Sequence, residues 1–302
     1  MGVDAVLAGE LPEGPAARAR RRTLRGAWVG IIPFALYVAF FLGLPLYEVV
    51  YGAFTTDAGS ATSGNLSASF HSQYLEAFKT SLLLSLWTAL IGGFFGLWLA
   101  AAVVTSKPHS ALRRIIGSAS GVFAYFAGVP LAFTWIAALG HFGTVTLILK
   151  DIGIDLYAGS FNISSLTGVY LAYVYFQVPL MVLLITPALE GLRTEWREAA
   201  SGLGASTFSY LRYVAAPVLA PAVLGALLLL FGNAFAAYAT ALALVNGTLP
   251  LVPSQIQSLI SGNVFVNEKG LGLALGVEMI VVIGFVMLGY SALQRRAGRW
   301  LQ

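Results

Sequence analysis

The chain has 302 residues, of which 58% are hydrophobic and only 10% are charged, and its mean hydropathy is +0.81. An ordinary soluble domain contains about 45–50% apolar and about 25% charged residues, so this composition excludes a soluble globular enzyme and a disordered chain. The sequence has no cysteine, which excludes disulfides, thiolate catalysis and cysteine-based metal sites. The excess of apolar residues therefore predicts a chain that lies in a lipid bilayer.

The chain contains six hydrophobic segments, each long enough to cross a bilayer, which takes about 20 helical residues. They are Ala27–Phe54, Ser81–Val104, Ile115–Leu139, Ser165–Leu189, Ala215–Val245 and Gly270–Leu293. This pattern predicts an all-α polytopic membrane protein with six transmembrane helices. The membrane domain then covers residues 27–293, between a tail of residues 1–26 and a short tail of residues 294–302.

The basic residues are unevenly distributed between the two sides that these crossings define. One side carries Arg18, Arg20, Arg21, Arg22, Arg25, Lys107, Arg113, Arg114, Arg193, Arg197, Arg212, Arg295, Arg296 and Arg299. Only Lys79, Lys150 and Lys269 fall on the other side. Because cytoplasmic loops carry an excess of Lys and Arg, we expect both termini to be cytoplasmic. The net charge of +4 then reflects topology, and no nucleic-acid partner is expected, because the basic residues lie between apolar segments.

The segments expected on the outer side differ in character. Thr55–Gln73 is rich in Ser, Thr, Gly and Asn and predicts a solvated loop, whereas Lys150–Asn162 is short and polar. Asn246–Gly270 contains prolines and glycines, Gly262 among them, around an apolar stretch. It predicts either a segment that dips into the membrane or a short capping helix. Within the membrane segments, the Gly-x-x-x-Gly pairs 92/96, 117/121 and 272/276 indicate close helix packing.

The longest expected cytoplasmic loop is Glu190–Val214, and its apolar residues recur at helical spacing. Gly202 and Gly204 interrupt this pattern, which predicts two short amphipathic helices that meet at a turn. Ala199 and Ala200 would give the first helix a narrow face that fits a groove on another protein, with the Glu198 carboxylate beside it. A helix that lies on the lipid headgroups is the alternative that periodicity alone leaves open.

The same segment resembles the signature of a known family. Glu198-Ala199-Ala200 is followed after three residues by Gly204, and after nine more by Val214, Ala216 and Pro217. This spacing is similar to the cytoplasmic-loop signature of inner-membrane permease subunits of binding-protein-dependent ABC importers, which reads Glu-Ala-Ala, three residues, Gly, nine residues, Ile-x-Leu-Pro. Val214 stands where the family has Ile, and Ala216 stands where it has Leu.

The resemblance implies the type I permease fold of these importers, in a bacterial inner membrane. It also implies that Glu198, Ala199, Ala200, Gly204 and Pro217 form a coupling element that docks on a separate ATPase subunit. The expected partners are a pair of ATPase subunits, a second permease that is identical or homologous, and an external solute-binding protein.

The chain itself carries no recognisable cofactor site or catalytic site. It lacks a Gly-x-x-x-x-Gly-Lys-[Ser/Thr] phosphate loop, so we expect no enzymatic activity in this chain and ATP hydrolysis in the partner. The three histidines, His71, His109 and His141, are too far apart for a familiar metal-ligand spacing, and no metal site is expected. An intramembrane enzyme would need a nucleophile with a base or a metal cluster, and neither pattern is present.

Five polar residues within the membrane segments are candidates for the translocation pathway. They are Glu278, Asn233, Tyr238, Tyr173 and Gln177. Glu278 lies about eight residues, or about 12 Å, into the last segment, where an ionisable group is costly and marks either a pathway or a buried hydrogen bond. For the other four residues an interhelical hydrogen bond is the alternative to a pathway role.

The expected substrate is a small polar solute of the polyamine type. Leu203-Gly204-Ala205-Ser206 resembles the version of the signature found in polyamine, ferric-iron, sulfate and molybdate permeases, and Glu278 suits a cation. Ferric iron, phosphonate and sugar remain open from the sequence. The alternative function is a self-sufficient secondary transporter, which would show several intramembrane ionisable residues and repeated interrupted helices.

Overall fold

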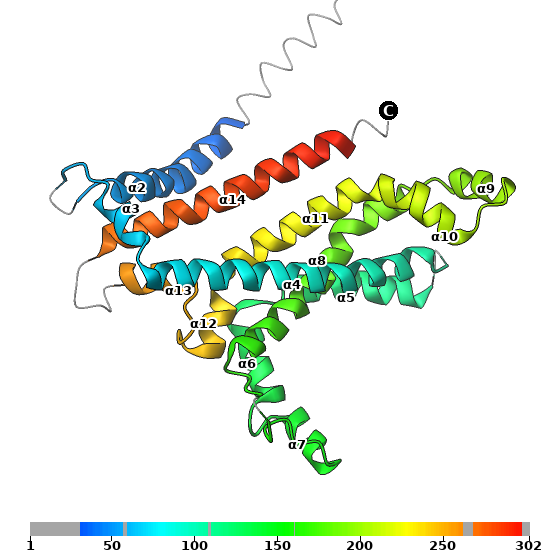
Figure 1. Cartoon of the computed structure of the whole chain (residues 1–302), viewed down its shortest axis with the longest axis horizontal. Coiled ribbons are helices and arrows are strands. Elements are labelled where there is room, and N and C mark those ends of the chain that lie inside the picture. Colours follow the sequence, from blue (N-terminus) through cyan, green and yellow to red (C-terminus); the bar gives the residue numbers. More distant parts are fainter. Residues whose placement is uncertain (1–30, 57–58, 108–109, 160, 262–267, 298–302) are drawn as a thin grey trace, which may run out of the picture. The chain divides into compact units, whose positions relative to one another are not determined.

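The computed structural model describes residues 31–56, 59–107, 110–159, 161–261 and 268–297. Over these ranges the regular structure is helical, apart from an isolated antiparallel bridge between Thr55 and Ala61, which confirms the all-α prediction (Figure 1). Several residues of the sequence predictions lie outside the described ranges. These are residues 1–26 with Arg18, Arg20, Arg21, Arg22 and Arg25, the start of the first segment at residues 27–30, and also His109, Gly262 and Arg299.

Within the described residues, six helical segments are long and apolar enough to cross a membrane. They are Ile31–Ala53, Ser72–Thr105, Gly128–Asp151, Leu166–Glu190, Thr207–Ala236 and Lys269–Arg295. The number six agrees with the sequence prediction. The chain divides after Gly52 into two compact units, and the first unit holds the first span except its last residue. In this span a π-helical turn, η1 (Ala39–Gly43), precedes α2 (Leu44–Ala53).

The second unit is built around α4 (Ser72–Thr105), which lies against both α8 (Leu166–Glu190) and α11 (Ala216–Ala236). Two glycines allow this approach. A Cβ on Gly96 would come within 2.5 Å of the Met181 Cβ and 2.6 Å of the Val178 carbonyl oxygen, both on α8. The close packing expected for the pair 92/96 is therefore confirmed, because a Cβ on Gly92 would likewise meet α8.

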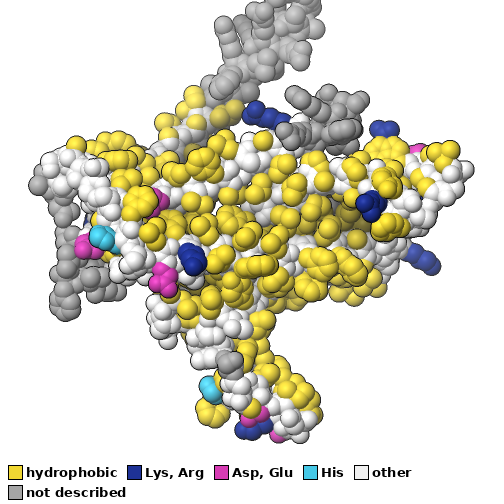
Figure 2. Space-filling model, in the orientation of Figure 1, with side chains coloured by type: hydrophobic (Ala, Val, Ile, Leu, Met, Phe, Trp, Pro, Cys, Tyr) yellow, Lys and Arg dark blue, Asp and Glu magenta, His cyan; other side chains and the backbone are white. Residues whose placement is uncertain are grey.

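The helices of the second unit run alternately between two ends of this unit. Figure 1 shows α4, α8 and α14 (Lys269–Ala297) finishing towards the end at which α5 and α11 begin. Figure 2 shows a largely hydrophobic surface over the helices, with charged side chains towards their ends. Large side chains such as Trp98 and Phe285 are 70% and 71% exposed, which is unfavourable in water and normal against lipid.

The third predicted segment, Ile115–Leu139, is not one helix. The chain instead forms α5 (Ala111–Tyr125) and α6 (Gly128–Leu139), and α7 (Thr144–Asp151) extends the span beyond the predicted end. Gly128 has φ +75°, which a residue with a side chain rarely adopts. Its N–H donates to Thr240 Oγ1 at 2.8 Å, so the break is held by a side chain from another helix.

The fifth predicted segment, Ala215–Val245, is also interrupted. α11 ends at Ala236, and α12 (Ala239–Val245) follows as a separate helix. At the other end, α10 (Thr207–Tyr210) continues through a π-helical turn, η2 (Leu211–Ala215), directly into α11. The second short helix of the predicted cytoplasmic loop is therefore an extension of the fifth span and not a free element.

Two of the expected outer loops contain helices. In Thr55–Gln73 the prediction of a solvated loop is wrong in part, because α3 (Gly64–Ser69) packs against α14 and α4 already begins at Ser72. In the Asn246–Gly270 segment the structure has α13 (Val252–Ile260), a short helix that packs on α14 and α4. The Val252 N–H, which α13 leaves free at its start, donates to Ser81 Oγ of α4 at 3.0 Å.

Candidate functional site

The predicted coupling element is a short, exposed helix. α9 (Thr194–Gly202) has no buried residue, and Glu198 and Ala199 are both exposed on it. Glu195 lies in the first turn, where a negative charge stabilises the helix N-terminus. The prediction of two short helices meeting at a turn is confirmed, because α10 begins five residues after α9 ends.

The turn after α9 explains why the signature spaces its alanines and glycine as it does. Gly204 has φ +77°, and its N–H donates to the Ser201 carbonyl at 3.0 Å. The next N–H, of Ala205, donates to the Ala200 carbonyl at 2.9 Å. These two bonds form a Schellman motif, in which glycine takes the left-handed position and caps the last turn of the helix. The motif requires the glycine to lie four positions after the residue whose carbonyl accepts the second bond, and Gly204 lies four positions after Ala200.

The chain then enters α10 through a second cap. The Ser206 side chain is the N-cap of α10 and accepts a hydrogen bond from the Ser209 N–H at 3.2 Å. Leu203 and Phe208 flank the turn and are 89% and 69% exposed. Two large apolar side chains are thus exposed on the same loop as Glu198. The two caps therefore define the path of the loop, which exposes the Glu198 carboxylate and the apolar side chains of Leu203 and Phe208.

Pro217 is the second residue of α11, which continues without a break from the π-helical turn η2. Because proline has no N–H to donate to the preceding turn, it removes one hydrogen bond of this continuous helix at the point where the helix is π-helical. It is exposed, and it follows the π-helical turn η2. The last residue of the signature thus lies within the fifth span, where η2 passes into α11.

Two of the candidate pathway residues bind backbone carbonyls of α11 and of the break after it. Tyr173 is 1% exposed, and its hydroxyl donates to the Ala237 carbonyl at 2.8 Å, at the break between α11 and α12. Gln177 is fully buried, and its Nε2 donates to the Leu230 carbonyl at 2.8 Å. These are interhelical hydrogen bonds, and they hold α8 to α11.

The other three candidates lie elsewhere. Asn233 is exposed on α11, and Tyr238 is half-buried at the break between α11 and α12. Glu278 is partly buried on α14, and its Oε1 accepts a hydrogen bond from the hydroxyl of Ser69 on α3. The structure therefore brings Tyr173 and Tyr238 to the same helix break and places Glu278 against α3.

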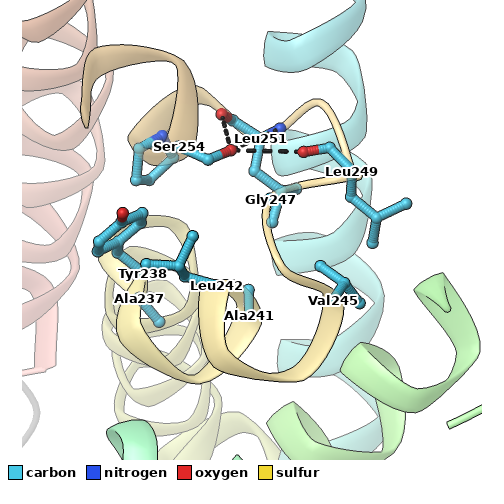
Figure 3. Close-up of a pocket in the computed structure, with 10 residues that line it drawn as sticks. Ala237, Tyr238, Ala241, Leu242, Val245, Gly247, Leu249, Leu251 and Ser254 are labelled. Carbon is cyan, nitrogen blue, oxygen red and sulfur yellow. Dashed lines mark hydrogen bonds between the residues drawn. The ribbon is translucent and has the colours of Figure 1, made fainter. Parts of the chain in front are cut away.

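A small cavity lies beside this break. Figure 3 shows residues of α12 facing the following loop and the start of α13 across it, with Tyr238 at one side. Its volume is about 10 Å³, which is space for about one water molecule. The lining is Ala237, Tyr238, Ala241, Leu242, Val245, Gly247, Leu249, Leu251, Pro253 and Ser254. In this conformation the cavity is therefore too small to hold a solute.

The two helix breaks were missed by the sequence analysis. The apolar runs continue across both of them, so composition gives no sign of an interruption. Gly128 followed by Pro130 was the local signal for the first break, because a proline two residues inside a helix fits its first turn. No group of three or more His, Asp or Glu residues that could hold a metal occurs among the described residues.

Comparison with known proteins identifies the class of this chain. Residues 92–299 match the family of binding-protein-dependent transport system inner membrane components, so the chain belongs to this family. It is therefore an inner-membrane permease of a binding-protein-dependent ABC importer, a transport component rather than an enzyme.

Two relatives differ in the solute that their names give. A probable sulfate transport system permease protein of Nephroselmis olivacea is 30% identical over 58% of this chain and 59% of its own length. A spermidine/putrescine transport system permease protein PotC homolog of Mycoplasma pneumoniae is 25% identical over 86% of both chains. The match to the first relative covers less than two thirds of that protein.

A solved structure has the same fold. A chain of the bacterial alginate ABC transporter, in complex with an alginate pentasaccharide-bound periplasmic protein, superposes with a TM-score of 0.71 over 94% of this chain and 98% of that one. The two chains are 16% identical, so the likeness concerns the fold. It confirms the predicted fold of an ABC importer permease.

Proposed function

We propose that the α9 turn is the contact through which a separate ATPase subunit drives this permease. The observation that carries the proposal is the exposed α9 with its glycine-capped turn, which presents Glu198, Ala199 and the apolar Leu203 outside the helix bundle. A short helix with a narrow alanine face suits a groove, and an exposed carboxylate suits an Arg or Lys at its rim. α10, η2 and the first turn of α11, with Pro217, would pass the movement along the fifth span.

The complete transporter would contain two ATPase subunits, a second permease and an external solute-binding protein. The alginate transporter supports the last of these, because its structure includes a periplasmic protein. Membership of this family favours the importer over a self-sufficient secondary transporter. The side that carries α9 would face the cytoplasm, where ATP is available.

A charge reversal at Glu198 tests the contact. In the complex co-purified from its native cells, Glu198→Lys should lower both solute uptake and the ATPase activity that the binding protein stimulates, while the chain still inserts. The matched control is Glu195→Lys, which makes the same charge change one turn earlier on α9. Equal uptake by Glu198→Lys and the unmodified chain, at equal expression, would remove the assignment.

We further propose that the solute is small and charged, with a polyamine-type cation as the first candidate. Glu278 supports a cation, since its carboxylate lies within the last span and bonds to Ser69. Asn233 and Tyr238 would contribute polar groups to the pathway, with Tyr173 and Gln177 holding α8 to α11 and to the break after it. The sulfate permeases among the relatives favour an oxyanion as the second candidate.

Uptake by whole cells distinguishes the two candidates. A strain that lacks the chain is compared with the same strain after its restoration, using radiolabelled putrescine and radiolabelled sulfate. Restored putrescine uptake supports the cation, and Glu278→Gln should then reduce it while Glu48→Gln, on the first span, should not. Restored sulfate uptake alone would overturn the polyamine proposal and leave the importer proposal in place.

A further inference from the structure

An ion pair joins two helices at the start of the α9 loop, the segment of residues 191–210 that follows α8 and carries α9 and α10. Arg113, in the first turn of α5, and Glu190, the last residue of α8, form a salt bridge between Nη2 and Oε1. The two residues are 77 positions apart in the sequence, and α5 packs along α8. A guanidinium and a carboxylate in direct contact form a charge-assisted hydrogen bond with a defined geometry.

Each of these charges is at the unfavourable end of its own helix. The N-terminus of a helix carries a partial positive charge and the C-terminus a partial negative charge. Arg113 is a cation at a helix N-terminus, and Glu190 is an anion at a helix C-terminus. The excess of basic residues in cytoplasmic loops accounts for an arginine here, but it does not account for the glutamate. The contact with Arg113 explains why a glutamate is found at the C-terminus of α8.

The position of the pair connects the α9 loop to the corner between α4 and α5. Only three residues separate Glu190 from the start of α9 at Thr194. On the other side, Ser110 is the N-cap of α5 and accepts a hydrogen bond from the Arg113 N–H, and its hydroxyl is 3.1 Å from the Ser106 hydroxyl. A displacement of α9 can therefore reach Ser106, at the end of α4, and Ser110, at the start of α5, through this ionic contact.

α5 leads from this contact to the first helix break. It has 15 residues and is therefore about 22 Å long. Three residues after its end, the Gly128 N–H donates to the hydroxyl of Thr240, which is buried on α12. α12 begins just beyond the second break, at which Tyr173 binds the Ala237 carbonyl. One continuous helix thus joins the base of the α9 loop to the two interrupted spans.

We propose that Arg113 and Glu190 are positioning residues that transmit the movement of the α9 loop to α5 and to the helix breaks. This inference rests on the proposed coupling function of α9. The side chains are 31% and 43% exposed, and ion pairs at this exposure contribute little to stability. Loss of the pair therefore changes the response to ATP rather than the folding of the chain.

The test is a charge exchange in the co-purified complex, reconstituted in lipid nanodiscs with its binding protein. Arg113→Glu and Glu190→Arg each place two like charges together, and each should lower the stimulation of ATPase activity by the binding protein about 5-fold or more, the lower bound of typical coupling between sites. The double variant restores opposite charges and should return the stimulation to within about twofold of the unmodified complex. The single variants should change thermal stability little, and the double variant should be at least as stable as the unmodified complex, because each exchanged charge then lies at the favourable end of its helix.

The control is Arg114→Glu, which makes the same charge change at the next residue of α5 and tests for an effect on membrane insertion. A double variant as impaired as the single variants, in an assembled complex, would overturn the proposal, as would single variants with normal stimulation. Glu198→Lys is measured in parallel. If it uncouples the complex and the Arg113 and Glu190 variants do not, only this inference fails, whereas normal stimulation in every variant would also reject the coupling role of α9.

Discussion

Gly204 shows how one backbone angle shapes the proposed coupling surface. At φ +77° the chain turns back after α9, and the two hydrogen bonds of the turn depend on that angle. A Cβ at Gly204 would have open space around it, so packing does not require glycine there. The requirement comes from the left-handed conformation, which costs about 1–2 kcal/mol for a residue with a side chain.

Replacing Gly204 therefore tests the turn without a steric clash. Gly204→Val should destabilise the α9 turn by about 1–2 kcal/mol or more, since a β-branched side chain strongly disfavours positive φ. Amide hydrogen exchange in residues 199–206 should become faster, and transport should fall. Gly202→Val is the matched control, because Gly202 also has open space but does not have a positive φ. Equal exchange rates in the two variants would contradict the role of the angle.

At the scale of the helices, the glycines of α4 decide how closely α8 can approach. The Gly-x-x-x-Gly pattern occurs at several places in the sequence, but only the structure distinguishes them. A Cβ on Gly96 would collide with the α8 backbone, whereas Gly117, in a pair with the same spacing on α5, has nothing within 4 Å. The spacing predicted tight packing for all three pairs. A Cβ on Gly272 would also lie 3.1 Å from Leu259 and Ile260 of α13, so it is the α5 pair, 117/121, that has open space instead of a packed neighbour.

Gly96→Ala should destabilise the helix bundle. Helix propensity alone favours alanine by about 1 kcal/mol, but the added Cβ meets the Val178 carbonyl oxygen, and such overpacking costs about 1–3 kcal/mol. The midpoint of thermal unfolding in detergent should fall. Gly284→Ala on α14 is the control, since nothing lies within 4 Å of its Cβ, and that midpoint should stay the same or rise. A rise in both variants would mean that α4 and α8 tolerate a wider separation.

The interrupted helices show where a linear pattern is insufficient. A run of apolar residues reports that a segment is buried in lipid or protein, but it does not report where the backbone hydrogen bonds go. At Gly128 the free N–H is bound by Thr240, and at Ala237 the free carbonyl is bound by Tyr173. Both partners lie more than 60 positions away in the sequence, so the breaks are stable only in the folded bundle.

At the scale of the whole protein, the distribution of charge predicts which side of the membrane carries α9. Within the described residues, Lys107 follows α4, Arg113 and Arg114 lie in the first turn of α5, Arg193, Arg197 and Arg212 lie between α8 and α11, and Arg295 lies near the end of α14. Figure 1 shows these ends of the helices on the side where α9 and α10 are found. By the positive-inside rule this side should be cytoplasmic. Lys150, at the end of α7, should then be external.

The absence of cysteine makes this orientation easy to measure. Ser201→Cys, on exposed α9, should react with a membrane-impermeant maleimide only after intact spheroplasts are permeabilised. Ala158→Cys, in the exposed loop after α7, should react before permeabilisation, and it serves as the matched control. Labelling of Ser201→Cys in intact spheroplasts would reverse the orientation and exclude an ATPase contact at α9.

The sequence alone determined that the chain lies in a lipid bilayer, how many spans it has and which family it belongs to. These depend on local properties of the chain: the length of each apolar segment, and the spacing from Glu198 to Pro217, of which the Gly204 turn explains the part from Ala200 to Gly204. Only the tertiary structure decided where spans are broken, which glycines pack, and that Arg113 meets Glu190. Those features need partners from distant segments, and a hydrogen bond, a close approach or an ion pair exists only when folding brings both partners together.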